Sequence, residues 1–300
     1  MTDGNEEVPA NPTPGVRPAW VDDALFPFES RLAEVDGHTL HYVDEGEGPP
    51  LLLLHGNPAW SFLYRHLIAG LRSDHRCVAV DLPGFGLSNA RPGFGHLPAE
   101  HSAVVERFVD HLGLERFTLM VQDWAGPIGL GMAGRRPELV DRLVIGNTWT
   151  WPVGDDKHFT RFSGFFGGNL GRMLVRRFNL FVNALIPKGH TASKLTRAEM
   201  EHYRAPFPTP ASREPTSILP REIVRSAGYL AEVEAGLAVL SHLPVLIVWG
   251  GKDIAFREQE RSRFEAAFPD HTTVPLHEAG HHVQDDAPAE VLAAMRSFLA

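Results

Sequence analysis

The sequence is poor in cysteine, in excess positive charge and in long apolar runs, and each shortage excludes a class of protein. Cys77 is the only cysteine, so no internal disulfide can form and a reducing compartment is favoured. The net charge of −9 argues against a nucleic-acid surface, which needs clustered Lys and Arg. No run approaches the roughly 18 apolar residues of a membrane-spanning helix. We therefore expect no nucleic-acid or membrane partner.

The first 22 residues also lack the features of a secretory signal. Pro9, Pro12, Pro14 and Pro18 stand among acidic and polar residues, without a basic start and an apolar stretch. Such a proline-rich segment is typical of a loose, partly extended arm. We expect residues 1–22 to form this arm, and we expect a cytoplasmic location.

Short apolar runs recur along the 300-residue chain and alternate with helix-length patterns. Seven segments have the character of strands, several of them apolar throughout as in strands buried on both faces: 40–43, 51–54, 77–80, 117–121, 143–145, 245–248 and 272–274. Apolar residues at helical spacing predict helices over 99–112, which Gly113 ends, and over 128–136 before Pro137. This alternation predicts an α/β fold with a doubly wound, mostly parallel sheet.

The alternation stops between 152 and 222, where the sequence becomes aromatic, basic and rich in glycine. Four phenylalanines between 159 and 166 precede a proline-rich stretch over 206–220. We expect an inserted helical cap over residues 152–222, with a core domain formed by 23–151 and 223–300. Ligands of open α/β sheets bind at the carboxyl ends of the strands, which the cap would cover. Its phenylalanines would line an apolar cavity or form the core of the cap itself.

The segment 121–126, Val-Gln-Asp-Trp-Ala-Gly, follows a predicted strand and opens a predicted helix. This is the form of a nucleophile elbow, with Asp123 where esterases have serine. The small residues Ala125 and Gly126 let the helix start approach the strand, which pushes the Asp123 side chain out over the sheet. The helix N-terminus would stabilise an anion there. An aspartate at this point is also a common N-cap, and only its partners decide between the two readings.

Two later side chains supply such partners. In hydrolases with this elbow, the chain order is nucleophile, acid and histidine. Asp253 and His281 each follow a predicted strand, so both fall in loops at carboxyl ends of the sheet. Alone, Asp253 would be a turn residue after two glycines and His281 a surface histidine. Together with Asp123 they form a predicted catalytic triad, for which the adjacent His282 fits the Gly-His step less well.

The segment from His277 to His281 also matches the H-E-x-x-H pattern of zinc sites. That pattern requires a helix, which brings both histidines to one face. Gly280 within the segment and Pro275 just before it disfavour a helix here. We therefore expect no metal.

With these motifs in place, the sequence resembles the haloalkane dehalogenase family, whose members have the α/β-hydrolase fold. The similarity extends over about residues 25–300 and is looser in the cap. The Asp-Trp elbow and a His-Gly-Asn-Pro segment are fairly specific together, whereas either alone occurs in other hydrolases. The segments that carry the resemblance are His-Gly-Asn-Pro at 55–58, Asp-Leu-Pro-Gly-Phe-Gly at 81–86, Gln-Asp-Trp at 122–124, Asn-Thr-Trp at 147–149, and Gly-His-His-Val-Gln at 280–284.

The resemblance implies donors for a leaving halide. In the family, the residue after the nucleophile is a tryptophan whose indole N–H holds the halide, which is Trp124 here. One subset uses the asparagine of His-Gly-Asn-Pro as the second donor, here Asn57, and other members use a cap tryptophan. The sequence has no tryptophan between Trp151 and Trp249, which favours Asn57.

Two further comparisons with the family concern the acid and the elbow. Some members place the catalytic acid after the sixth strand. No carboxylate stands at 146–148 in this sequence, so the role falls to Asp253. Ala125 is a departure, since the family usually has glycine there, but it keeps the residue small.

The residues themselves predict a two-step chemistry. A carboxylate is ionised at neutral pH, so Asp123 could displace halide from an sp³ carbon without a base and form an alkyl ester. His281, oriented by Asp253, would then deprotonate the water that hydrolyses the ester. The oxyanion would rest on the backbone N–H groups of Trp124 and Asn57. The predicted partners are a small apolar haloalkane, water and the released halide, and no cofactor is required.

An epoxide hydrolase is the alternative that the sequence leaves open, because that class is similar at the elbow and the triad. Epoxide opening creates an alkoxide, which two cap tyrosines protonate in that family. Only four tyrosines are present, and Tyr203 and Tyr229 alone lie in or near the cap. A fluoroacetate dehalogenase would carry arginine at the position of Trp124. An inactive hydrolase fold used for binding would not need an intact triad.

Overall fold

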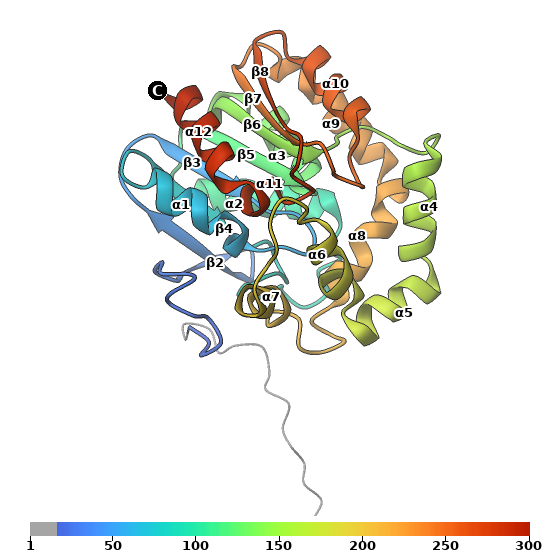
Figure 1. The fold of residues 1–300 in the computed structure, drawn as a ribbon. Helices are drawn as coiled ribbons and strands as arrows, with labels where there is room; N and C mark the ends of the chain where they lie inside the picture. The colour runs from blue at the N-terminus through green and yellow to red at the C-terminus, as the bar shows by residue number, and fades with distance from the viewer. Residues whose placement is uncertain (1–16) are drawn as a thin grey trace, which may run out of the picture.

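The computed structural model describes residues 17–300, and an eight-stranded sheet runs through their centre (Figure 1). The strand order is β1-β2-β4-β3-β5-β6-β7-β8, in which β2 pairs antiparallel with β1 and β4 and all other pairs are parallel. The predicted doubly wound, mostly parallel sheet is therefore confirmed. The strands are β1 Arg31–Val35, β2 His38–Glu45, β3 Pro50–Leu54, β4 Arg76–Val80, β5 Phe117–Asp123, β6 Val140–Thr148, β7 Val245–Gly250 and β8 His271–Leu276.

Each of the seven predicted strands lies within an observed strand. The central strands β3, β5 and β7 are buried along nearly their whole length, because helices cover both faces of the sheet. This explains their uninterrupted apolar runs. The sequence does not predict β1, since only Ala33 and Val35 of this edge strand are buried and no apolar run marks it.

Helices pack on both faces of the sheet, with α1 against α12 on one face and α2, α3 and α9 on the other (Figure 1). The helix predicted over 99–112 is α2, and Gly113 ends it with a φ of 61°. The helix predicted from residue 128 is α3, which begins earlier, directly after the elbow. The core helices are α1 Arg65–Leu71, α2 Pro98–Leu112, α3 Ala125–Arg135, α9 Ala227–Leu240, α10 Glu258–Ala267, α11 Val283–Asp286 and α12 Pro288–Leu299, with short 3₁₀ turns at Ser61–Tyr64 and Pro137–Leu139.

Between β6 and β7 the chain forms a second group of helices, which lies at one side of the sheet (Figure 1). It corresponds to the segment in which the strand–helix alternation stops, although α8 continues past residue 222 and ends at Arg225. The chain then returns to the core, because α9 packs on α3. The group consists of α4 Lys157–Phe166, α5 Asn169–Phe178, the π-helical turn η3 Phe181–Leu185, α6 Ile186–Lys188, α7 Arg197–Arg204 and α8 Glu214–Arg225.

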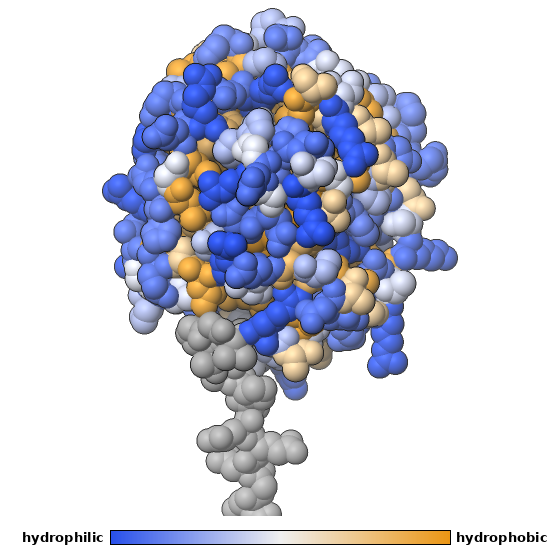
Figure 2. All heavy atoms as spheres, turned by 90° about the vertical axis from the view of Figure 1, so that its left-hand side faces the viewer, coloured by the Kyte–Doolittle hydropathy of each residue, from blue (hydrophilic) through white to orange (hydrophobic). Residues whose placement is uncertain are grey.

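The expected N-terminal arm lies outside the described residues up to residue 16. From residue 17 the chain is attached to the body: Arg17 Nη1 donates to the Phe28 carbonyl at 2.6 Å, and the Asp22 N–H donates to His202 Nε2 at 3.0 Å. The side of the molecule away from α4 and α5 is mostly hydrophilic, with scattered apolar residues (Figure 2). Within residues 17–300, no helix combines the length and apolar character needed to cross a membrane.

Candidate active site

Asp123 ends β5 at a sharp turn into α3. Its φ of 53° lies in the left-handed region that residues other than glycine rarely adopt, as expected for a nucleophile elbow. Gly126 is required because a Cβ atom there would collide with the hydroxyl of Thr148. The N-cap residue of α3 is Trp124, so Asp123 is not the plain helix cap that the sequence left open.

His281 lies between the two aspartates of the predicted triad. Its Nδ1 atom is 2.9 Å from Asp253 Oδ2, and its Nε2 atom is 3.6 Å from Asp123 Oδ2. The Asp253 side chain is fully buried, whereas those of Asp123 and His281 are each 13% exposed and line a cavity. Neighbouring parallel strands end at the same edge of the sheet, which brings these three side chains together.

Two amides that the sequence analysis did not single out hold the histidine and its acid in place. Asn147 donates from Nδ2 to Asp253 Oδ2 at 2.9 Å and accepts the Gly250 N–H at 2.8 Å. Gln122 Nε2 lies 2.8 Å from His281 Nε2 and 3.1 Å from the His281 carbonyl. Because an amide N–H only donates, His281 Nε2 accepts and its proton lies on Nδ1, toward Asp253. Both amides belong to motifs that carry the family resemblance, the one sequence signal that could have found them.

Burial and charge compete in setting the protonation of the triad. Burial raises the pKa of Asp123 above its ordinary value, against the opposing effects of His281 and of the backbone N–H groups of Trp124 and Asn57. Burial would lower the pKa of His281. The charge and hydrogen bond of Asp253, helped by Asp123, outweigh burial and raise the pKa of His281 above its ordinary value of 6.5. A neutral His281 is therefore well suited to take a proton from water.

Asn57 and Trp124 line the cavity beside Asp123. The backbone N–H of Asn57 donates to Asp123 Oδ1 at 2.7 Å. The preceding Gly56 is needed because a Cβ atom there would collide with the same carboxylate. The structure thus brings both predicted halide donors, and the predicted backbone donors, to the elbow.

The side-chain amide of Asn57 is oriented by α8. Its Nδ2 atom donates to the Thr216 carbonyl at 3.4 Å. In a regular helix this carbonyl would accept the N–H of the residue four positions later, but that residue is Pro220, which has no N–H. The proline therefore leaves the carbonyl free for Asn57. One N–H of the amide is held by α8, and the second has no hydrogen-bond partner among the described residues.

A cavity of about 120 Å³ adjoins the triad and has mainly apolar walls. Phe159, Phe162, Pro220 and Ile223 line it from α4 and α8, and Phe256 lines it from the loop after β7. Phe159 and Phe162 therefore follow the first of the two readings that the sequence left open. The other two, at 165 and 166, do not line the cavity, and the one at 165 is exposed and fits neither reading.

The residues expected for rival chemistries lie elsewhere. The Tyr203 hydroxyl donates to Asp285 Oδ2 at 2.7 Å, and the Tyr229 hydroxyl donates to the Pro127 carbonyl at 2.8 Å. Neither tyrosine lines the cavity, so an epoxide oxygen bound there would lack these donors. The segment 277–281 is a loop rather than a helix, so its two histidines do not share a helical face.

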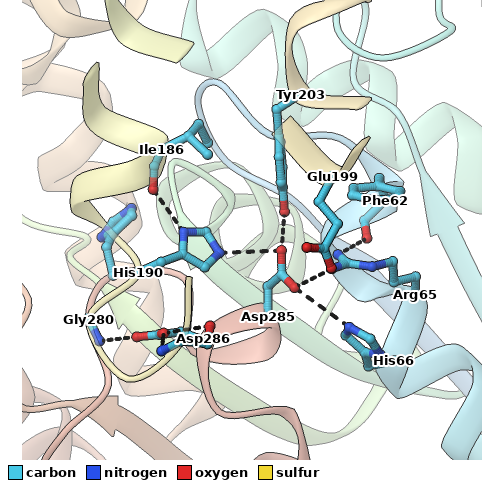
Figure 3. A network of polar contacts seen from close by, with 12 residues as sticks. Phe62, Arg65, His66, Ile186, His190, Glu199, Tyr203, Gly280, Asp285 and Asp286 are labelled. Carbon is cyan, nitrogen blue, oxygen red and sulfur yellow. Dashed lines mark hydrogen bonds and ion pairs between the residues drawn. The ribbon is translucent and has the colours of Figure 1, made fainter. Parts of the chain in front are cut away.

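The loop that carries His281 is fastened by Asp286 (Figure 3). The Asp286 carboxylate accepts the backbone N–H of Gly280 at 2.7 Å. It also accepts the backbone N–H groups of residues 191, 192 and 193 at 2.7–3.0 Å. One carboxylate therefore joins the segment before α7 to the residue that precedes the catalytic candidate.

A second cluster surrounds the buried carboxylate of Asp285 (Figure 3). Arg65 Nη2 donates to Asp285 Oδ1 at 2.6 Å and to Glu199 Oε1 at 2.8 Å. His66, Glu199 and Asp285 lie close enough to share a metal ion, but the Arg65 guanidinium already donates to both carboxylates. The cluster is therefore an ion-pair network that joins α1, α7 and α11.

The mostly parallel sheet, the aspartate elbow and the chain order of Asp123, Asp253 and His281 define an α/β-hydrolase. In agreement, residues 49–288 match the family described as alpha/beta hydrolase fold.

Relatives narrow this class. The chain is 45% identical to haloalkane dehalogenase 2 of Mycobacterium tuberculosis, over 91% of this chain and 96% of that protein. It is 32% identical to cis-3-alkyl-4-alkyloxetan-2-one decarboxylase of Shewanella oneidensis, over 92% and 90%. The solved haloalkane dehalogenase DbeA of Bradyrhizobium elkani superposes with a TM-score of 0.80 at 27% identity, covering 90% of this chain and 99% of that one. The chain belongs to the haloalkane dehalogenase family.

Proposed function

We propose that the protein hydrolyses small apolar haloalkanes to an alcohol and a halide ion through a covalent ester on Asp123. The observation that carries this proposal is the position of the Asp123 carboxylate. It stands at an elbow in a mainly apolar cavity, beside Asn57 and Trp124 and within 3.6 Å of His281.

In the first step, an Asp123 oxygen attacks the carbon that bears the halogen, and the carbon–halogen bond breaks. The electron pair of that bond leaves with the halide, which needs donors but no proton. The indole N–H of Trp124 and the free amide N–H of Asn57 would bind it. Because α8 already holds the other N–H of Asn57, the donor is preorganised.

In the second step, water replaces the Gln122 amide N–H at His281 Nε2 and gives up a proton to this atom, and the hydroxide attacks the ester carbonyl. The Nδ1–H···Asp253 hydrogen bond stabilises the imidazolium that forms. The backbone N–H groups of Asn57 and Trp124, which contact the Asp123 carboxylate, would hold the oxyanion. Collapse of the intermediate releases the alcohol and restores the carboxylate, and one proton is released per halide.

We further propose that residues 152–222 act as a cap that excludes water from the first step. Phe159, Phe162 and Pro220 from this segment support the idea, since they form part of the cavity wall. For the chain as a whole we propose a cytoplasmic location, supported by the single, buried Cys77.

Halide release from 1-bromobutane and 1,2-dibromoethane tests the proposal, with the wild type and Asp123→Asn measured side by side. We expect stoichiometric halide and alcohol from the wild type and none from the variant. Styrene oxide and a cis-3,4-dialkyl oxetan-2-one serve as counter-substrates. If neither haloalkane releases halide, turnover of styrene oxide would indicate an epoxide hydrolase instead. Turnover of the oxetan-2-one would indicate a decarboxylase.

A further inference from the structure

The charge of the chain is distributed unevenly. Residues 157–198 contain eight Lys and Arg and no Asp or Glu, although the whole chain has a net charge of −9. All 37 acidic residues therefore lie outside this segment, together with the other 20 basic residues. The segment comprises α4, α5, η3, α6 and the start of α7, so these helices are basic in a chain that is acidic as a whole.

The same segment exposes large apolar side chains. Among residues 17–300, eight large hydrophobic side chains are exposed, and four of them lie within 14 residues of one another. These are Phe165 (51% exposed), Leu170 (61%), Met173 (47%) and Phe178 (57%). Apolar side chains scattered singly over a surface need no explanation, but a cluster at the end of one helix and along the next does.

The helical spacing explains why these side chains point outward. On α5, Leu170, Met173 and Arg177 are exposed at spacings of three and four residues, whereas Gly171 and Val175 are buried. The helix therefore packs through a narrow small-residue face and presents an apolar and basic stripe. Both α4 and α5 lie at the outer edge of the molecule (Figure 1).

Few acidic partners neutralise this surface. Arg172 and Arg176 share the single carboxylate of Glu214. The exposed side chains of Arg161 and Arg177 form no ion pair with any described residue, and the guanidinium of Arg177 lies 5.6 Å from the centroid of the Phe178 ring. The combination of free cations and apolar side chains on one helix face is typical of helices that lie in the interface of a lipid bilayer.

We propose that the α4–α5 face, defined as Arg161, Phe165, Leu170, Met173, Arg177 and Phe178, docks the protein on an anionic lipid bilayer. The apolar side chains would enter the headgroup region, and the arginines would contact anionic headgroups. This is peripheral binding. The expectation of no membrane partner rested on the lack of a spanning segment, which does not bear on peripheral binding.

Docking through this face would place the cavity next to the bilayer. On α4, Phe159 and Phe162 line the cavity, whereas Arg161 and Phe165 point outward. Ile254 lines the cavity and is 62% exposed, which marks an opening, and the neighbouring Ala255 carbonyl accepts from His158 of α4. Small apolar compounds concentrate in bilayers, so substrate would be richest beside this opening.

The test is the binding of the purified full chain to vesicles, measured by co-sedimentation. Vesicles of phosphatidylcholine with about one third phosphatidylglycerol are compared with phosphatidylcholine alone, and we expect at least about tenfold stronger binding to the former, weakening as salt rises. Arg161→Glu/Arg177→Glu and Leu170→Ser/Met173→Ser should each lose most of this binding. Arg107→Glu/Arg116→Glu makes the same charge change at exposed sites elsewhere, and Val239→Ser makes one apolar-to-polar change at another exposed site.

Thermal unfolding of every variant identifies any that fail to fold. Neither thermal unfolding nor vesicle binding depends on the proposed activity. Equal binding to the two kinds of vesicle would overturn the proposal, as would α4–α5 variants that bind like the controls. Oligomers that dissociate in the α4–α5 variants, without vesicle binding by the wild type, would assign the face to a second copy of the chain and would also overturn it.

Discussion

His281 Nε2 lies 3.6 Å from Asp123 Oδ2, which is too far for a hydrogen bond, while Nδ1 of the same ring is hydrogen-bonded to Asp253. The histidine therefore does not activate Asp123 in the way that a histidine activates a serine. The carboxylate is instead held by the backbone N–H of Asn57, and in the proposed reaction it acts without a base. The two chemical steps can be separated by mutation, and the following predictions use this separation.

Removal of either proposed halide donor should slow the first step. We expect Trp124→Phe and Asn57→Ala each to lower kcat/KM for a chloroalkane by about 10²- to 10³-fold, the usual effect of losing one preorganised donor. The loss should be smaller for an iodoalkane, because iodide is a weaker hydrogen-bond acceptor. Trp20→Phe, at a partly exposed tryptophan outside the cavity, is the matched control. Equal losses in Trp20→Phe would contradict the assigned role.

Pro220→Ala should weaken halide binding through Asn57. The new N–H at position 220 would compete for the Thr216 carbonyl and release the Asn57 amide from its position. We expect inhibition by bromide to weaken several-fold. Ile223→Ala, on the same helix and also lining the cavity, removes apolar volume without adding a donor and should leave bromide inhibition nearly unchanged. Identical behaviour of the two variants would show that cavity volume, rather than the carbonyl, is responsible.

The pKa of His281 should fall by different amounts when each of the two aspartates loses its charge. Since the Asp253 and Asp123 charges both raise the pKa of His281, with Asp253 the larger cause, Asp253→Asn should lower this pKa more than Asp123→Asn does. The wild-type value should exceed 6.5. Because His281 must be neutral to act as a base, turnover should fall as the pH drops through its raised pKa. NMR titration of His281 in the two variants measures which pKa decrease is larger. A pKa unchanged in both variants would refute the prediction.

Asp286→Asn should destabilise the fold by about 2 kcal/mol at neutral pH, because the carboxylate accepts four backbone N–H groups. Burial would raise the pKa of Asp286, but these N–H groups lower it below its ordinary value. The stabilisation is therefore complete above the unfolded pKa of about 3.9 and is lost as pH falls through the folded pKa. Urea unfolding at neutral and acid pH checks both points, with the exposed Asp270→Asn as control. A difference that grows in acid would contradict this account.

The sequence predicts those parts of the site that local pattern determines. The elbow at 121–126 and the strand ends before Asp253 and His281 follow from apolar runs and small residues. Asn147 and Gln122 are not predictable in this way, because their roles depend on which strands become neighbours in the sheet. The same holds for Asn57, whose amide is oriented by a carbonyl that lies 159 residues later in the chain.

The cap shows a different limit of prediction. Composition alone marks residues 152–222 as an insertion. The positions of its helices, and the side that each helix turns toward the cavity, depend on packing against the core. The sequence could not tell that Phe162 lines the cavity and Phe165 faces outward, although they are only three residues apart. It likewise could not tell that Tyr203 is directed to Asp285 rather than to the cavity.

The central claim is that Asp123 forms a covalent ester which His281 is needed to hydrolyse. Intact-mass measurement of His281→Ala after exposure to 1,2-dibromoethane or 1-bromobutane tests it most directly. We predict one halide released per site and a protein heavier by one alkyl group, an adduct that is absent when Asp123→Asn is added to the variant. An unmodified His281→Ala protein that still turns over haloalkane, or that releases no halide at all, would contradict the account.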